Sequence, residues 1–447
     1  MIVAAALLTA VQPASAQSVL RDAETEAVLA DMARPIIAAA GPEVSGTKIV
    51  LLQDKEINAF VAGGQVIYVH SGLITTADNA NQVQGVIAHE LGHITGGHIV
   101  RFADGAKAAG GISILSLLLG AAAMAAGGAE AGMGILSAGQ QAAMSSFLSF
   151  SRTQESSADA AGATFLGKAG ISGKGSVAFF QKLRQQEYRL SSSYANSDPY
   201  GRTHPMSADR AEMLEAVYKR SPSWEAKTDP ALEARFQRIK AKLAGYVDDP
   251  TTTVRKYPVT DKSVPAHYAR AYAWHKSAYP DRALSEVEAL LAAVPHDPYF
   301  LELKGQVLLE SGRPADAIAP LREAVQRTSS DPLIASSLGH ALIASEDPKN
   351  FVEAQKVLRT SVQRDEDNPF AWYQLGIVYD REGDEPRAAL ATAERSNLEG
   401  ENKIALSSAR MAMAGLPQGT PDYLRAQDIA MVSETALKKD KKYREPK

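Results

Sequence analysis

Hydrophobic and polar positions change their spacing several times in the first hundred residues. Residues 22–40 carry apolar side chains at helical spacing, which predicts an α-helix. Residues 47–54 and 64–72 instead predict two β-strands, joined through residues 55–63. The side chains of residues 66–69 alternate in the manner of a strand with one buried face. The chain therefore begins with a mixed α and β pattern.

From Asn81 the apolar side chains recur at helical spacing again. This pattern predicts an amphipathic helix, which Gly96 and Gly97 should end or loosen. Further helices are expected over residues 154–168 and 175–190. The apolar face of the first of these helices carries Val83, Val86, Ile87, Leu91 and Ile94.

The segment 106–150 is poor in charge. Between Lys107 and Arg152 the only charged residue is Glu130. Residues 112–126 approach the length of a bilayer span, whereas glutamines and serines make the second half more polar than a typical span. We expect a helical hairpin that is buried or faces a membrane surface. A transmembrane hairpin is the alternative.

The C-terminal part of the chain repeats itself. Gly305 and Gly339 lie 34 residues apart, and Gly376 follows 37 residues later. A 34-residue period of paired helices is the signature of tetratricopeptide repeats, whose concave surface usually binds a peptide or protein partner. An ordinary helical bundle is the alternative. The third copy matches the repeat pattern at Trp372, Leu375, Gly376, Tyr379 and Ala388.

Composition narrows the choice of partners and compartment. The 447 residues have a net charge of −4, which gives no basic surface for nucleic acid. There is no cysteine, so disulfides, thiolate ligands and a lipid anchor on cysteine are excluded. The apolar run at residues 4–11, followed by small residues at 14–16, predicts an export signal that is cleaved after Ala16.

These patterns divide the chain into four parts. Residues 1–16 form the signal peptide, and residues 17–246 form a globular domain that contains the segment 106–150. Residues 247–264 carry proline and threonine without periodicity, which indicates a linker. The repeat domain follows over residues 265–440.

Three of the nine histidines and a glutamate fall within residues 89–98. On a helix His89 and His93 share one face, about 5–6 Å apart at Cβ, which suits two imidazoles that bind one metal ion. Glu90 lies about 100° round the helix, so it cannot easily bind the same ion. It can still reach a water molecule beside that ion. The motif therefore predicts a metal centre with Glu90 as its general base.

A third ligand is expected from a second helix. Glu155 follows His93 by 62 residues, and Asp159 lies one turn further along. Glu155 would complete a site of two histidines and one glutamate with an open fourth position, as in catalytic zinc centres. Asp159 would accept a hydrogen bond from a ligand histidine and fix its tautomer. Taken alone, both acids would equally suit the solvent-facing side of a helix.

Two further histidines have polar surroundings in the sequence. His98 follows two glycines, so its side chain should point off the helix face. We expect it to lie at the surface or to contact a ligand residue from behind, and not to bind the metal itself. His204 precedes a proline in a polar loop. There it would hydrogen-bond a developing oxyanion, or cover the zinc ion in a resting state.

The motifs at residues 89–93, 155–159 and 203–210 occur in a fixed order. The sequences HELGH, ESSAD and THPMSADR together resemble the peptidase family that includes HtpX and the CAAX prenyl proteases. The resemblance implies a mainly α chain. Its first part would be an α+β metallopeptidase domain of the gluzincin type with a small sheet, and its second part an α-solenoid of tetratricopeptide repeats.

The same resemblance implies a role for individual residues. Glu90 would be the catalytic base, and His204 a switch or transition-state ligand near the metal. Arg210 would belong to the same loop-helix element as His204. Residues 59–69 would form part of the edge against which an extended substrate lies. The implied ligands of one Zn²⁺ per chain are His89, His93 and Glu155.

An exported peptidase of this family with repeats resembles its periplasmic members in Gram-negative bacteria. This implies a metalloendopeptidase that acts on unfolded or misassembled envelope proteins. Its partners would be outer-membrane β-barrel proteins and their assembly machinery. Substrate would add as a strand along residues 66–69, and the segment 106–150 would make peripheral contact with a membrane. The alternatives are a chaperone or scaffold with a gated or structural zinc site, and an integral-membrane protease.

Overall fold

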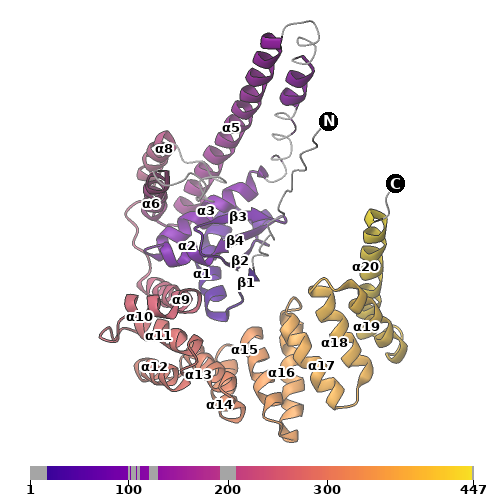
Figure 1. Cartoon of the computed structure of the whole chain (residues 1–447). Helices are drawn as coiled ribbons and strands as arrows, with labels where there is room; N and C mark the ends of the chain where they lie inside the picture. Colours follow the sequence, from indigo (N-terminus) through magenta and orange to yellow (C-terminus); the bar gives the residue numbers. More distant parts are fainter. Residues whose placement is uncertain are drawn as a thin grey trace, which may run out of the picture. The chain divides into compact units, whose positions relative to one another are not determined.

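A computed structural model of the chain describes most of the predicted elements (Figure 1). It divides into two compact units, one containing Thr25–Leu243 and the other containing Asp22–Glu24 and the chain from Ala244 onward. The predicted signal peptide and His204 lie outside the described residues. The structure describes residues 18–98, 101, 107, 111–119, 129–191 and 208–444.

The first unit contains a four-stranded sheet with the order β1-β2-β4-β3. Strand β2 (Lys48–Gln53) runs parallel to β4 (Val66–His70). The short strand β1 (Ser18–Val19) and strand β3 (Ala59–Ala62) pair antiparallel with β2 and β4 respectively. Strand β4 therefore has a neighbour on each side, and β3 forms an edge of the sheet.

This topology corrects two predictions. Residues 55–63 were predicted only as the connection between two strands, but they contain β3, which is four residues long and so shows too little alternation to be recognised. The expected substrate edge at residues 66–69 is also wrong. Both sides of β4 are occupied by β2 and β3, so an added strand can pair only with β3 on that side of the sheet.

Helix α3 (Ala80–Thr95) is buried along most of its length between other helices and the sheet. Every residue from Ala80 to His93 is buried, and α3 packs against α5 and α6. The helix begins at Asn79, whose side chain accepts a hydrogen bond from the amide of Gln82, and it ends before Gly96, as predicted. The other helices are α1 (Ala23–Ala40), α2 (Ser71–Thr76), α5 (Ala129–Lys168), α6 (Lys174–Ser191), α8 (Ala208–Lys219) and α9 (Pro230–Val247).

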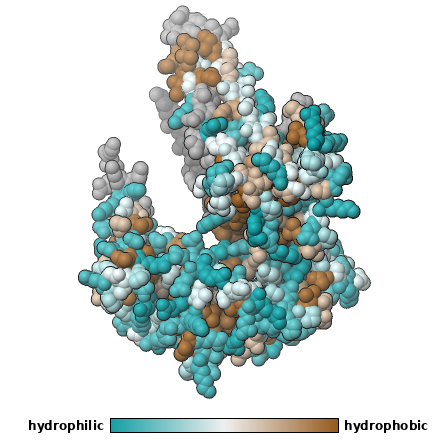
Figure 2. Space-filling view, turned by 180° about the vertical axis from the view of Figure 1, so that it is seen from behind, coloured by the Kyte–Doolittle hydropathy of each residue, from teal (hydrophilic) through white to brown (hydrophobic). Residues whose placement is uncertain are grey.

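The segment 106–150 contains two helical stretches, which are residues 111–119 and the first half of α5. Ser116 of the first stretch lies against Gly139 of α5, so the two stretches pack together. Apolar residues gather near the top of this hairpin (Figure 2). Among the described residues no helix has the length and hydropathy of a membrane span. The predicted helix start at residue 154 is wrong, because α5 runs unbroken from Ala129. The exposed apolar side chains include Ile114, Leu115, Leu117, Leu118 and Leu119.

The second unit is a succession of antiparallel helix pairs, which confirms the predicted repeats. The connection between α15 and α16 is three residues longer than that between α13 and α14, and it contains the short helix η2 (Pro348–Asn350). This turn accounts for the wider spacing of Gly339 and Gly376. The helices are α10 (Pro250–Lys256), α11 (Val264–Lys276), α12 (Pro280–Ala293), α13 (Pro298–Glu310), α14 (Pro314–Arg327), α15 (Pro332–Ala344), α16 (Phe351–Arg364), α17 (Pro369–Arg381), α18 (Glu385–Leu398), α19 (Asn402–Gly415) and α20 (Pro421–Arg444).

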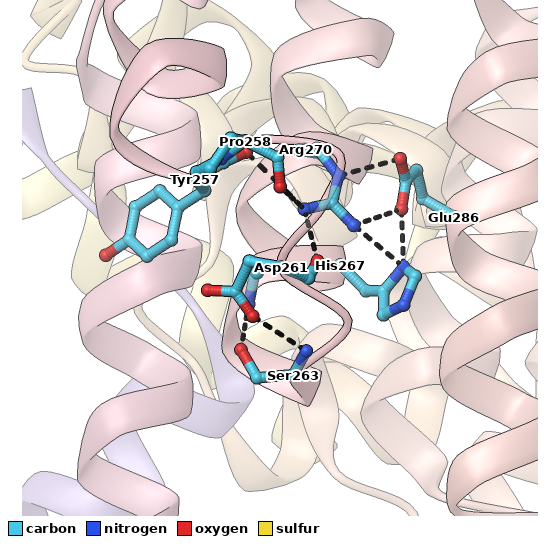
Figure 3. Close-up of polar contacts among 8 residues, drawn as sticks. Tyr257, Pro258, Asp261, Ser263, His267, Arg270 and Glu286 are labelled. Atoms are coloured by element: carbon cyan, nitrogen blue, oxygen red, sulfur yellow. Dashed lines mark hydrogen bonds and ion pairs between the residues drawn. The ribbon is translucent and has the colours of Figure 1, made fainter.

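A buried arginine fixes the chain between α10 and α11 (Figure 3). The side chain of Arg270 is 1% exposed and makes two hydrogen bonds of 2.8 and 2.9 Å with the carboxylate of Glu286. It also donates to the carbonyl groups of Tyr257, Pro258 and Asp261 at 3.4, 2.9 and 2.9 Å. The range predicted as a linker thus contains helix α10 and a turn that is bonded to the first repeat.

Candidate metal centre

Helices α3 and α5 approach each other closely where the predicted ligands lie. A Cβ atom on Gly92 would overlap the backbone of Ala158, so only glycine allows this distance between the two helices. His89 lies one turn before His93 on α3, while Glu155 lies on α5 before Ala158. The close crossing therefore directs the side chains of both helices into one space.

Three ligand atoms converge in that space. The Nε2 atoms of His89 and His93 are 3.1 Å apart. The Glu155 carboxylate lies 3.4 Å from His89 Nε2 and 3.3 Å from His93 Nε2. Ligands about 2.0–2.2 Å from a tetrahedral zinc ion are separated from one another by about 3.3–3.5 Å. Two imidazoles and one carboxylate at this spacing fit zinc, and they form a group that can hold a metal ion.

His89 has a carboxylate behind it. Its Nδ1 atom is 2.9 Å from Oδ1 of Asp159, so Nδ1 donates its hydrogen to Asp159 and Nε2 faces Glu155. Burial alone would lower the pKa of His89, but the hydrogen bonds with Asp159 and Glu155 outweigh it and raise the pKa to about 10. The metal-free imidazole is therefore protonated at neutral pH, and a bound metal ion would replace that proton.

His93 has an imidazole behind it instead. The Nδ1 atom of His98 lies 2.9 Å from Nδ1 of His93, and the side chain of His98 is 5% exposed. Burial lowers the pKa of His98, which keeps the ring neutral and able to accept the hydrogen of His93. The turn at Gly96 and Gly97 brings His98 back to the helix. Of the two places expected for His98, the structure shows the one behind a ligand.

The remaining predicted residues differ in how far the structure describes them. Glu90 lies on α3 beside His89 and is fully buried. Arg210 is part of α8, and its side chain lies outside the described residues, as does all of His204. Phe180 of α6 was not predicted, yet its ring meets the His89 ring edge to face, with centroids 5.9 Å apart. From the sequence, Phe180 can be predicted only to lie on the apolar face of a helix.

Comparison with known proteins gives two domain matches. Residues 20–218 match peptidase family M48, and residues 268–332 match the tetratricopeptide repeat. The beta-barrel assembly-enhancing protease of Yersinia pestis is 25% identical over 384 residues, which cover 83% of this chain and 76% of that protein. The Escherichia coli K12 protein of the same name is 24% identical over 83% of this chain and 75% of its own length.

A third relative matches a smaller share of this chain. Metalloprotease LoiP of Escherichia coli K12 is 32% identical over 184 residues, which are 40% of this chain and 66% of that protein. The family match covers α3 and the part of α5 that carries Glu155, so it includes all three converging side chains. The first part of this chain is therefore a peptidase family M48 domain, and tetratricopeptide repeats follow it.

Proposed function

We propose that this chain is a zinc metalloendopeptidase that hydrolyses peptide bonds of unfolded or misassembled envelope proteins. The observation that supports this proposal is the convergence of His89, His93 and Glu155 within one buried group. Three protein ligands with room for a fourth position are typical of catalytic zinc, whereas structural zinc sites are usually closed by four protein ligands.

Each side chain near the metal group has a distinct task in this proposal. His89, His93 and Glu155 hold the zinc ion. When bound, zinc would supply Lewis-acid chemistry, which lowers the pKa of a water ligand and polarises a carbonyl group. Glu90 takes the proton of the attacking water and delivers it to the leaving amine, a contribution of about 10²–10⁴-fold to the rate. Asp159 holds the ring of His89 in the tautomer that presents Nε2 to the ion.

The substrate binds as an extended strand along β3. Within the described sheet β3 pairs only with β4, so its outer side offers a row of backbone donors and acceptors. Main-chain pairing does not depend on substrate sequence, and it requires an unfolded segment. This mode of binding favours misassembled proteins over folded ones. His204 acts near the metal as a switch or transition-state ligand, and Arg210 supports the same loop-helix element.

The partners follow from the repeats and from the relatives. Relatives named beta-barrel assembly-enhancing protease match most of this chain, so we assign outer-membrane β-barrel proteins and their assembly machinery as partners. The repeat unit binds these proteins, and the cell compartment is the periplasm of a Gram-negative bacterium. The exposed apolar side chains of residues 114–119 make peripheral contact with a membrane.

Glu90→Gln tests the assigned chemistry. The amide is close in size to the carboxylate but cannot accept the proton, so we expect an unchanged zinc content and loss of casein cleavage by at least about 10²-fold. Glu43→Gln removes an exposed carboxylate from the same unit and serves as the control, with cleavage unchanged. Equal cleavage by the Glu90 variant and the parent would contradict the role of Glu90. Zinc binding without cleavage by the parent would instead favour a chaperone.

A further inference from the structure

A second group of metal-binding side chains lies at one end of the sheet. Ligand atoms of Asp54, Glu56 and His70 all fall within 4.8 Å of one another. Nδ1 of His70 is 3.7 Å from Oδ2 of Asp54. These residues do not include any member of the group formed by His89, His93 and Glu155, and the proposed protease mechanism gives them no task.

The fold brings this group together through two parallel strands. Asp54 follows the last residue of β2, and His70 is the last residue of β4. Leu52 of β2 is paired with His70, so the carboxyl ends of both strands meet at the same edge. The His70 ring also contacts the ring of Phe60 on β3. The two rings are in an edge-to-face arrangement with centroids 6.0 Å apart, which helps to hold His70 in place.

The loop that carries the two acids is rigidly attached to the start of α2. The Ser71 hydroxyl donates to the Asp54 carbonyl at 2.7 Å and accepts from the Asp54 amide at 3.1 Å. The Gly72 amide donates to the same carbonyl at 2.7 Å, and a Cβ on Gly72 would overlap the carbonyl groups of Lys55 and Glu56. The Glu56 amide donates to Oδ1 of Asp54 at 2.9 Å, which leaves Oδ2 directed at His70.

The charges of the group favour a divalent cation. His70 is 1% exposed, whereas Asp54 is partly exposed and Glu56 is exposed. A neutral imidazole is the form that binds metals. Two carboxylates and a neutral imidazole carry a charge of −2, which one divalent ion balances.

We propose that Asp54, Glu56 and His70 form a second metal site, which takes a divalent first-row transition ion such as zinc. One imidazole and two carboxylates suit such an ion better than Ca²⁺ or Mg²⁺, which prefer oxygen ligands alone. The site binds more weakly than the group on α3 and α5, because it has one imidazole instead of two and because Glu56 must become ordered. Water completes the coordination on the exposed side.

The bound ion would clamp the loop that leads into β3. The backbone carbonyl of Asn58 accepts a hydrogen bond from the His70 amide at 3.0 Å, and β3 begins at the next residue, Ala59. An ion held by both His70 and Glu56 would therefore restrain the entry to the edge strand. The effect on substrate binding rests on the function proposed above, but the metal site does not.

Zinc titration of the full-length, untagged, metal-free chain tests the proposal by isothermal calorimetry. We expect two binding events in the parent. Asp54→Asn/Glu56→Gln should remove the weaker event alone, because amide groups replace both charged ligands at nearly unchanged size. Glu155→Gln should weaken the stronger event alone, and Glu43→Gln should change neither. A single event in the parent that Glu155→Gln weakens, or a weaker event that survives in the Asp54/Glu56 variant, would overturn the second site.

Hydrogen exchange provides a readout that does not depend on a variant folding correctly. In the parent, zinc beyond the first equivalent should slow amide exchange in residues 54–62. Unchanged exchange there would contradict the clamp. A single event in the parent that the Asp54/Glu56 variant removes would instead count against the protease centre, so the two proposals fail in distinguishable ways.

Discussion

Replacing Arg270 by methionine should destabilise the repeat unit strongly. The guanidinium group is 1% exposed and makes a two-bond contact with Glu286, whose side chain is 15% exposed. Methionine keeps the apolar stem but removes every donor of the guanidinium group. The Glu286 carboxylate and the Asp261 carbonyl lose the bonds from Arg270, and the Pro258 carbonyl keeps only the bond from the Asp261 amide. Removing one member of a buried ion pair costs about 3–5 kcal/mol. We expect about 3 kcal/mol, because Glu286 keeps some exposure and its contact with His267.

Urea unfolding of the full-length protein measures this loss. With a slope of about 2–3 kcal/mol/M, a loss of about 3 kcal/mol lowers the midpoint of the repeat unit by about 1–1.5 M. Arg322→Met is the matched control. Arg322 forms the same two-bond contact with Glu353 in the same unit, but the two side chains are 40% and 35% exposed. Exposed pairs contribute about 0–1 kcal/mol, so its midpoint should move by less than about 0.5 M.

Two results would refute this reasoning. Equal shifts for Arg270→Met and Arg322→Met would show that burial does not set the cost. Failure of Arg270→Met/Glu286→Met to recover part of the loss would show that an uncompensated charge is not its cause.

The pH dependence gives a further check on the same pair. Burial would raise the pKa of Glu286, but hydrogen bonds from Arg270 and His267 outweigh it and lower the pKa. A carboxyl group with a lowered folded pKa stabilises the protein above its unfolded pKa of about 4.3, and this contribution is lost as the pH falls through the folded value. The stability difference between the parent and Arg270→Met should therefore shrink below about pH 4.

The remaining predictions concern the metal group. His98→Ala removes the acceptor of the His93 ring hydrogen, so zinc affinity should fall by about 10–100-fold in competition with a chelator, and an unchanged affinity would contradict this role of His98. Because the pKa of metal-free His89 is about 10, zinc must displace a proton at neutral pH. Zinc affinity should therefore rise by about tenfold per pH unit between about pH 6 and 8, and a pH-independent affinity would show that this proton is absent.

Much of this architecture is visible in the sequence because it depends on local spacing. His89 and His93 converge because four residues make about one helical turn, and the glycine period marks the repeats in the same local way. Strand β3 was missed because four residues give too few alternations. The start of α5 was missed because glycine, alanine and serine show no clear apolar period over its first half.

The residues that contact the two ligand histidines show which features of the site can be predicted from the sequence and which cannot. Asp159 could be predicted because it lies one turn after Glu155 on the same helix, so any helix that presents one acid to the metal presents the other beside it. His98 could not be assigned in this way, because its contact with His93 depends on how the chain turns at Gly96 and Gly97. Arg270 gives no sequence signal at all, since an arginine in a helical repeat is normally exposed. Its burial is a consequence of the chain folding back between α10 and α11, where its guanidinium group donates to three carbonyl groups. Long-range requirements of this kind, rather than helix periodicity, determine which polar side chains become fixed inside the protein.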